Sequence, residues 1–148
     1  MRAIEVYCSP EVAHTLLAVY RHAERHPSFL GYYFGEGVYP SATAWCNLSS
    51  GDAAAVWSIY TGVKKSVLSI NFEWMRSRGL PTEQLAKLAA ELKVLPGWGH
   101  IPEVLGNANF AQHPPLAPLA LARPDAADII IAALNDVLAA EKPTEVQA

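Results

Sequence analysis

Between residues 29 and 74, the apolar residues change from helical spacing to strict alternation, and this change limits the possible folds more than any other feature. Short segments rich in Gly, Pro and Ser separate the alternating runs; they are GEGVYPS, SSGD and TGVKKS. The runs themselves are YYF, ATAWCNL, AAVWSIY and VLSINFEW. Strands joined by links this short pair antiparallel. The pattern therefore predicts an antiparallel β-meander.

Most segments before and after this region have the spacing of helices. AIEVYC is rich in strand formers and predicts an N-terminal strand, after which Ser9 can cap a helix that has Pro10 at its first position. Pro27 predicts the end of that helix near residue 25. Further helices are predicted over 81–95, briefly near 102–105, and from Asp125 onward. An extended, partly buried run is predicted over 116–121.

These elements predict a single α+β domain over residues 1–141, followed by a frayed tail at 142–148. The domain would contain an N-terminal strand and helix, the antiparallel meander, and two further helices packed on one sheet face. The chain has 148 residues, of which 51% are hydrophobic and 17% charged. That length and composition suffice for one buried core.

Charge and cysteine content limit the possible partners and the compartment. The formal net charge is −3, which provides no general attraction to nucleic acid or to anionic membranes. No apolar run approaches the length of a bilayer span, so a membrane partner is not expected. Cys8 and Cys46 are the two cysteines, and the N-terminal residues do not resemble a secretory signal. We therefore expect a cytoplasmic protein.

Several residues have spacings that could support chemistry, but their neighbours do not. His22 and His26 are four residues apart, yet no acid directly follows His22 as in the zinc-protease pattern. Asp52 and Glu73 are separated by more than a strand, which makes a shared divalent ion a weak prediction. Cys8 precedes a helix but has no adjacent base. Nucleotide-binding and serine-hydrolase motifs are absent from the sequence. We expect no catalytic residue, metal or cofactor.

Alternation divides the meander into two faces. The predicted core face collects the apolar residues Ala42, Ala44, Cys46, Leu48, Ala55, Trp57, Ile59, Leu68, Ile70, Phe72 and Trp74. The opposite face mixes aromatic rings with short polar groups: Thr43, Trp45, Asn47, Ser58, Tyr60, Ser69, Asn71 and Glu73. An alternative interpretation of this second face is a solvated surface with cross-strand packing between Trp45 and Tyr60.

The mixed face is the predicted binding surface, because planar rings provide rigid contact area and polar groups provide directional hydrogen bonds. Its predicted binding residues, together with exposed aromatics near the first turn, are Trp45, Asn47, Tyr60, Asn71, Glu73, Tyr33 and Tyr39. Glu36 is a further candidate in that turn. A local positive rim could come from Lys64, Lys65, Arg76 and Arg78.

The sequence favours a non-catalytic binding or interaction module, such as an inhibitor, an immunity protein or an accessory subunit, whose partner is another protein. One alternative is a small enzyme of phosphoryl or small-molecule chemistry whose acids and histidines meet only in the fold. Another is a domain that binds single-stranded nucleic acid by stacking bases on Trp45 and Tyr60 beside Lys64 and Lys65. The net charge does not favour nucleic acid.

Overall fold

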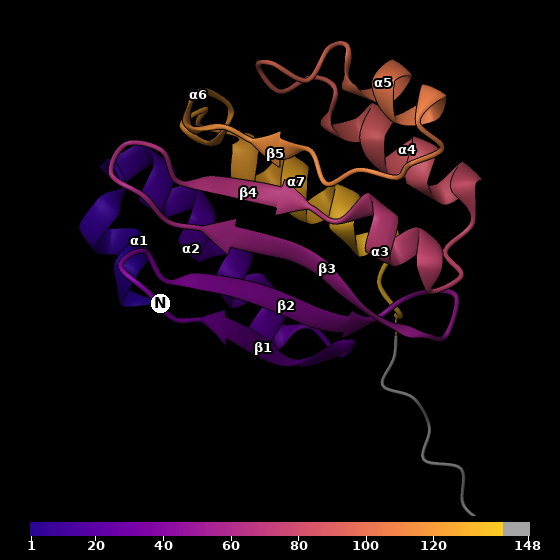
Figure 1. Ribbon diagram of the computed structural model, residues 1–148, viewed down its shortest axis with the longest axis horizontal. Helices are drawn as coiled ribbons and strands as arrows, with labels where there is room; N and C mark the ends of the chain where they lie inside the picture. The colour runs from indigo at the N-terminus through magenta and orange to yellow at the C-terminus, as the bar shows by residue number, and fades with distance from the viewer. Residues whose placement is uncertain (141–148) are drawn as a thin grey trace, which may run out of the picture.

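A five-stranded antiparallel sheet in the order β1-β2-β3-β4-β5 lies at the centre of the computed structural model, which describes residues 1–140 (Figure 1). The strands are β1 (Phe29–Gly35), β2 (Ser41–Asn47), β3 (Ala53–Tyr60), β4 (Val67–Ile70) and β5 (Pro115–Leu116). The helices within residues 1–140 are α1 (Arg2–Tyr7), α2 (Pro10–Arg25), α3 (Phe72–Ser77), α4 (Thr82–Leu92), α5 (Ile101–Asn107), α6 (Pro118–Leu121) and α7 (Ala126–Asn135). The frayed tail expected at 142–148 lies outside the described residues.

The predicted α+β fold class and the β-meander are confirmed. Strands β1 to β4 pair in chain order, each antiparallel to the next, as their short connections require. The order could not be read from the sequence. Strand β5 adds to β4 through the pair Leu68 and Leu116.

Helix α2 has the predicted boundaries, and its first turn shows why. The Ser9 hydroxyl accepts a hydrogen bond from the Val12 N–H at 3.4 Å, and Pro10 occupies the first helical position. The helix ends at Arg25, before Pro27. Its buried residues recur at helical spacing: Val12, Thr15, Leu16, Val19 and Ala23. This stripe packs into the core.

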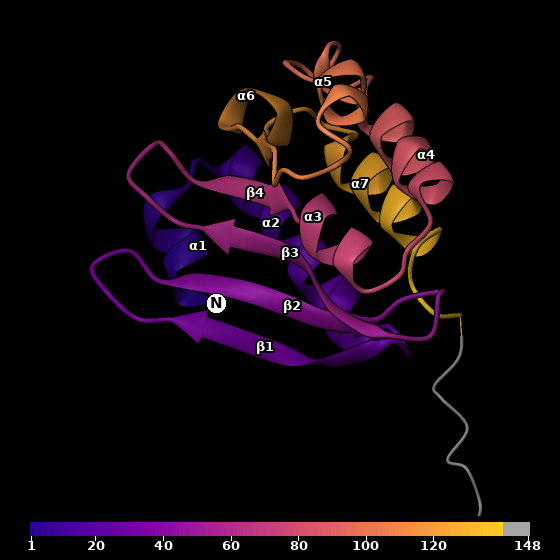
Figure 2. The ribbon, with the colours of Figure 1, turned by 45° about the vertical axis from the view of Figure 1, so that its right-hand side comes forward.

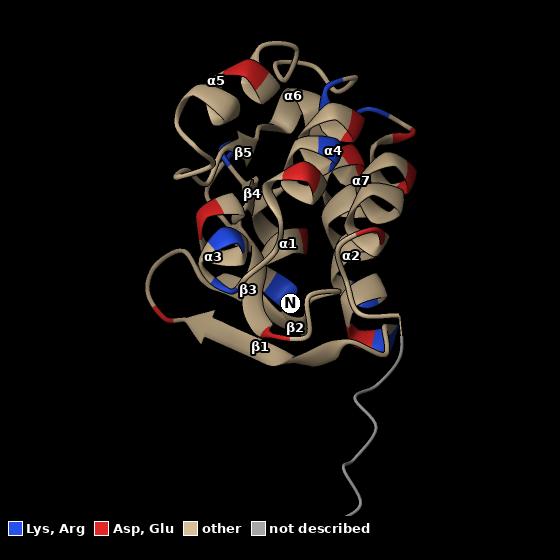
Figure 3. Ribbon diagram, turned by 90° about the vertical axis from the view of Figure 1, so that its right-hand side faces the viewer, with Lys and Arg blue, Asp and Glu red and all other residues tan. Residues whose placement is uncertain are grey.

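Helices α2 and α7 lie behind the sheet in Figure 1, and the turned view of Figure 2 shows α4 beside α7. Helix α3 follows β4 at one end of the sheet. Because the five strands contain no Lys, Arg, Asp or Glu, charge is confined to helices and connections, as Figure 3 shows. Within residues 1–140, each helix is too short or too polar to cross a lipid bilayer.

The predicted N-terminal strand is wrong, because residues 2–7 form α1. The helix buries Ile4 completely, while Val6 is exposed. Its backbone groups pair within the segment, and the Cys8 N–H donates to the Ile4 carbonyl at 3.2 Å. An isolated strand would leave such groups without partners.

The strand predicted over 67–74 ends at Ile70, and the chain then turns into α3. The Asn71 N–H donates to the Val56 carbonyl at 3.0 Å, and the Asn71 carbonyl accepts from the Met75 N–H at 3.1 Å. Phe72 and Met75 are both buried at a spacing of three, which is helical. Trp74, predicted on the core face, therefore lies on the exposed side of α3.

The extended run predicted over 116–121 is also wrong beyond its first residue. Pro115 and Leu116 form β5, and residues 118–121 form α6. Pro118 stands in the first turn of α6, where its missing N–H leaves no bond unmade. The short helix expected near 102–105 is present as α5, whereas the predicted helix over 81–95 spans Thr82–Leu92. In the described chain, α3 and α6 are thus additional to the three helices expected after the meander.

A bulge in β3 changes which face its residues occupy. Ala44 pairs with Trp57, but the next residue, Trp45, pairs with Ala55, so Val56 is the extra residue. Ala55 was predicted on the core face with Trp57. The bulge instead places it on the same face as its partner Trp45.

Candidate functional site

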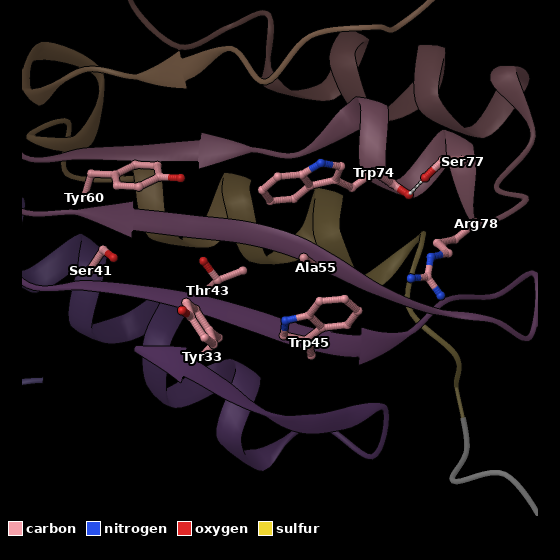
Figure 4. Close-up of a pocket in the computed structure, with 9 residues that line it drawn as sticks. All are labelled: Tyr33, Ser41, Thr43, Trp45, Ala55, Tyr60, Trp74, Ser77 and Arg78. Carbon is pink, nitrogen blue, oxygen red and sulfur yellow. Dashed lines mark hydrogen bonds between the residues drawn. The ribbon is translucent and has the colours of Figure 1, made fainter. Parts of the chain in front are cut away.

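The open face of the sheet forms a groove with a volume of about 620 Å³ between β1 and α3 (Figure 4). Its walls consist of four aromatic side chains from separate elements: Tyr33 of β1, Trp45 of β2, Tyr60 of β3 and Trp74 of α3. Tyr33 is 69% exposed, Tyr60 46% and Trp74 41%. We refer to this feature as the aromatic groove.

Strand alternation places the residues that form its floor. Ser41, Thr43 and Trp45 are alternate residues of β2 and all face the groove. Ala55 of β3 lies beside Trp45, and Figure 4 shows it between the indoles of Trp45 and Trp74. With only a methyl side chain, Ala55 leaves open the space between these rings.

A buried chain of hydrogen bonds supports the floor. The hydroxyls of Thr43 and Ser58 are 2.8 Å apart, and the Asn71 side-chain amide donates to the Ser58 hydroxyl at 3.2 Å. The Ser69 hydroxyl lies 3.3 Å from the Asn71 amide oxygen and 3.1 Å from the His113 carbonyl. Asn71 was predicted as an exposed contact, but it is 1% exposed and links β3 with the end of β4. This network fixes strand positions under the groove.

Arg78 is the charged residue in the groove lining, and it stands at the end of α3. Its guanidinium carbon lies 5.9 Å from the centre of the Trp45 ring, within range of a cation–π interaction. Arg78 caps the C-terminus of α3, and the next residue, Gly79, has φ +89° and donates its N–H to the Arg76 carbonyl at 3.1 Å. The Ser77 hydroxyl donates to the Trp74 carbonyl at 2.8 Å.

The rest of the predicted positive rim lies elsewhere. Lys64 lines a smaller hollow beside Tyr7 and Ser66, and Lys65 is exposed in the same turn. Arg76 is half-buried in α3 and does not line the aromatic groove. The groove therefore has one cationic group rather than a continuous basic track.

Glu73 pairs with a histidine that lies beside the groove residue Trp74. Its Oε2 lies 3.5 Å from Nε2 of His113, whose ring is centred 4.4 Å from that of Trp74. Burial lowers the pKa of His113, while the Glu73 carboxylate acts in the opposite direction and raises it. Neither residue lines the groove.

The seven predicted binding residues thus separate into three groups. Tyr33, Trp45 and Tyr60 line the groove. Asn71 is buried beneath the groove, and Glu73 pairs with His113 outside the groove lining. Asn47 is half-buried at the end of β2, where its backbone bonds Ser28 and Ala139, and Tyr39 packs edge-on against Tyr7 at 5.3 Å. Glu36 is exposed in the turn and does not line the groove.

Sequence reasoning did not place Trp74, Ala55 or Ser77 in this site. The spacing of Phe72 and Met75 was a signal for α3, and it would have turned Trp74 away from the core. The bulge that redirects Ala55 had no comparable signal, because Ala54, Ala55 and Val56 are all small apolar residues.

The remaining candidate residues have structural partners. His22 Nε2 lies 2.9 Å from the Asn135 side-chain oxygen, and His26 Nδ1 lies 2.8 Å from the Ser28 hydroxyl. Burial raises the pKa of the Cys46 thiol to about 11. Among residues 1–140, no group of three or more His, Cys, Asp or Glu side chains is placed to hold a metal ion. The Asp52 carboxylate accepts a bond from the Ala53 N–H at 3.1 Å.

Comparison of the chain with protein-family models, with curated proteins and with solved structures found no match.

Proposed function

We propose that this chain is a non-catalytic binding module, of the kind that serves as an inhibitor, an immunity protein or an accessory subunit, and that the aromatic groove is its recognition surface. The observation that supports this most is the convergence of four aromatic side chains from β1, β2, β3 and α3 on one groove of about 620 Å³. This volume lies within the range of about 300–1,000 Å³ typical of ligand pockets.

The side chains in the groove are suited to binding rather than to proton transfer. Its charged residue is Arg78, and a guanidinium stays protonated in proteins. General acid–base catalysis uses groups such as His and Glu within reach of the substrate. The pair formed by His113 and Glu73 lies outside the groove lining.

Another protein is the partner that these residue types favour. Tyr, Trp and Arg contribute most of the binding energy at protein interfaces, and they are the large side chains of the groove. We also propose a cytoplasmic location. Cys8 and Cys46 are both free thiols, as expected in a reducing compartment.

The experiment that tests this function is affinity capture from the native cell extract with three proteins: wild type, Tyr60→Ala and Tyr39→Ala. Tyr39 is a matched control because it is 50% exposed, close to the 46% of Tyr60, but lies outside the groove. We expect Tyr60→Ala to weaken binding of the captured partner by about 1–3 kcal/mol, and Tyr39→Ala to leave it unchanged.

Stability is measured on the same variants by chemical denaturation, so that loss of binding is not confused with unfolding. If Tyr60→Ala binds the partner as tightly as wild type, the aromatic groove is not the recognition surface. If both variants weaken binding equally, the surface extends to the turn between β1 and β2.

A small enzyme is the second candidate, because His113 contacts both Glu73 and the groove residue Trp74. Replacing His113 by Gln would abolish an activity that uses this pair and would leave simple binding intact. Single-stranded nucleic acid has less support, since Lys64 and Lys65 lie away from the groove. Titration with a labelled thymidine oligonucleotide at physiological salt tests it directly.

A further inference from the structure

Ala55 lies on the floor of the groove, where its small side chain leaves room for a flat group above it. Ala55 lies between the indoles of Trp45 and Trp74 in Figure 4, and its methyl group offers a low apolar floor. Aromatic rings prefer offset-stacked or edge-to-face neighbours, and the two indoles provide faces and edges for both arrangements. A planar aromatic group is therefore the best match for this part of the groove.

One end of the same space is positively charged. Arg78 lies over the edge of the space beside Trp45, and no Asp or Glu lines the groove within residues 1–140. A guanidinium binds a carboxylate through paired hydrogen bonds. The charge of the lining thus complements an anionic group adjacent to the aromatic one.

The groove is elongated along strand β2. Ser41, Thr43 and Trp45 follow one another along β2 at intervals of two residues, which corresponds to about 7 Å. Groups on one side of an extended peptide repeat at the same interval. The groove thus suits an extended chain running along β2 better than a compact molecule that occupies only the space over Ala55.

Building on the proposed function, we infer that the aromatic groove recognises an extended segment of a partner protein in which an aromatic and an acidic residue stand two positions apart, so that both side chains point into the groove. The aromatic ring lies over Ala55 between Trp45 and Trp74. The carboxylate pairs with Arg78, and the backbone of the segment follows the hydroxyls of Ser41 and Thr43.

The four tryptophans of the chain allow a direct test with internal controls. Trp45 and Trp74 line the groove, whereas Trp57 and Trp98 are each 2% exposed. The indole N–H signals of isotope-labelled protein are followed by NMR during titration with the capped peptide Gly-Ser-Phe-Ser-Glu-Gly, in which Phe and Glu stand two positions apart. We expect saturable shifts for Trp45 and Trp74, and none for Trp57 and Trp98.

Two control peptides test the two recognition elements. Replacing Phe by Leu in the peptide should weaken binding about fivefold, because stacking is lost. Replacing Glu by Gln should weaken it about threefold, since an exposed ion pair contributes little in water. In the protein variant Arg78→Gln, the Glu and Gln peptides should bind equally. Lys65→Gln makes the same charge change away from the groove and should preserve the difference.

A protein variant that fills the space over Ala55 gives an independent test, because it leaves all four aromatic side chains of the groove in place. Ala55→Leu should abolish peptide binding. Ala53→Leu is its control, because Ala53 lies on the same strand and face but does not line the groove. Thermal unfolding of both variants verifies that they are folded.

The inference is overturned if the peptide shifts no groove signal, if the Gln peptide binds wild type as tightly as the Glu peptide, or if Ala55→Leu still binds. Equal affinity for free 3-phenylpropionate would also overturn it, because the ligand would then be a small aromatic acid. If the peptides fail while Tyr60→Ala still loses the captured partner, the proposed function stands and only this sequence preference is wrong.

Discussion

The two faces of the sheet are formed by the same strands, but Trp57 on one face and Tyr60 on the other differ in the exposed fraction of their rings. On the covered face Trp57 is 2% exposed and belongs to the core, whereas Tyr60, three residues further along β3, is 46% exposed on the groove face. Residue type does not explain this contrast, because both rings could be buried. An exposed aromatic side chain gains little from folding, and a cluster of them on one face is typical of a surface for recognition.

The faces also differ in their polar groups. The core face of β2 is closed by the side chains of Ala42, Ala44 and Cys46, each at most 1% exposed. The groove face has a floor of hydroxyls supported by Asn71. We therefore expect substitutions on the covered face to change stability, and substitutions in the groove to change binding.

The largest effect should come from Trp57→Ala. It removes a fully buried side chain from the core, and we expect the free energy of unfolding to fall by about 3–5 kcal/mol. Tyr60→Ala, on the same strand, should lower it by less than about 1 kcal/mol. Chemical denaturation of both variants measures the contrast. Equal losses would mean that the groove face is part of the core.

A smaller loss should follow Asn71→Ala, which removes the amide that bonds Ser58 beneath the groove. Leaving buried partners unsatisfied costs about 1–3 kcal/mol of unfolding free energy. Asn47→Ala is the control, because the hydrogen bonds of Asn47 to Ser28 and Ala139 use its backbone atoms. A loss for Asn47→Ala as large as that for Asn71→Ala would contradict the role given to the buried network.

Gly79→Ala should have a smaller effect, with a cost of about 1 kcal/mol. Gly79 has φ +89°, a conformation that alanine resists, although no atom lies within 4 Å of an added methyl group. Because Gly79 directly follows Arg78, the substitution should also displace Arg78 and weaken peptide binding. Gly106→Ala, within α5 and equally unhindered, should be neutral or slightly stabilising. Thermal unfolding distinguishes the two.

Sequence reasoning located the features that depend on local chemistry. Ser9, Pro10 and Pro27 defined α2, and the turn segments defined the meander. The core parity of β2 is correct from Ala42 to Leu48, because alternation is uninterrupted there. Three groove residues, Tyr33, Trp45 and Tyr60, were named for the same reason.

One error arose where a residue fits both the alternation of a strand and the spacing of a helix. Phe72 continues the alternation of Leu68 and Ile70, and it also begins the helical pair with Met75, so the strand was extended too far. Which pattern prevails is decided by the Asn71 N–H reaching Val56 across the sheet, a contact that sequence does not reveal. The bulge at Val56 is similarly a consequence of how two strands pair.

The smallest effect concerns pH, and it distinguishes the two faces through their histidines. Burial lowers the pKa of His113 beside Trp74 and of His22 beside α7 below the ordinary 6.5. As pH falls below about 6.5, the unfolded chain takes up protons first. Stability should therefore be complete above that pH and decrease as pH falls from there through the lower pKa of the folded state.

On the groove side, the Glu73 carboxylate raises the pKa of His113 and so partly offsets the effect of burial. Glu73→Gln should therefore lower that pKa further and increase the loss of stability between about pH 7.5 and about pH 5.5. Glu83→Gln, an exposed change in the first turn of α4, is the control. Urea denaturation at the two pH values measures the difference. Equal losses for both variants would show that the 3.5 Å contact between His113 and Glu73 has no energetic weight in solution.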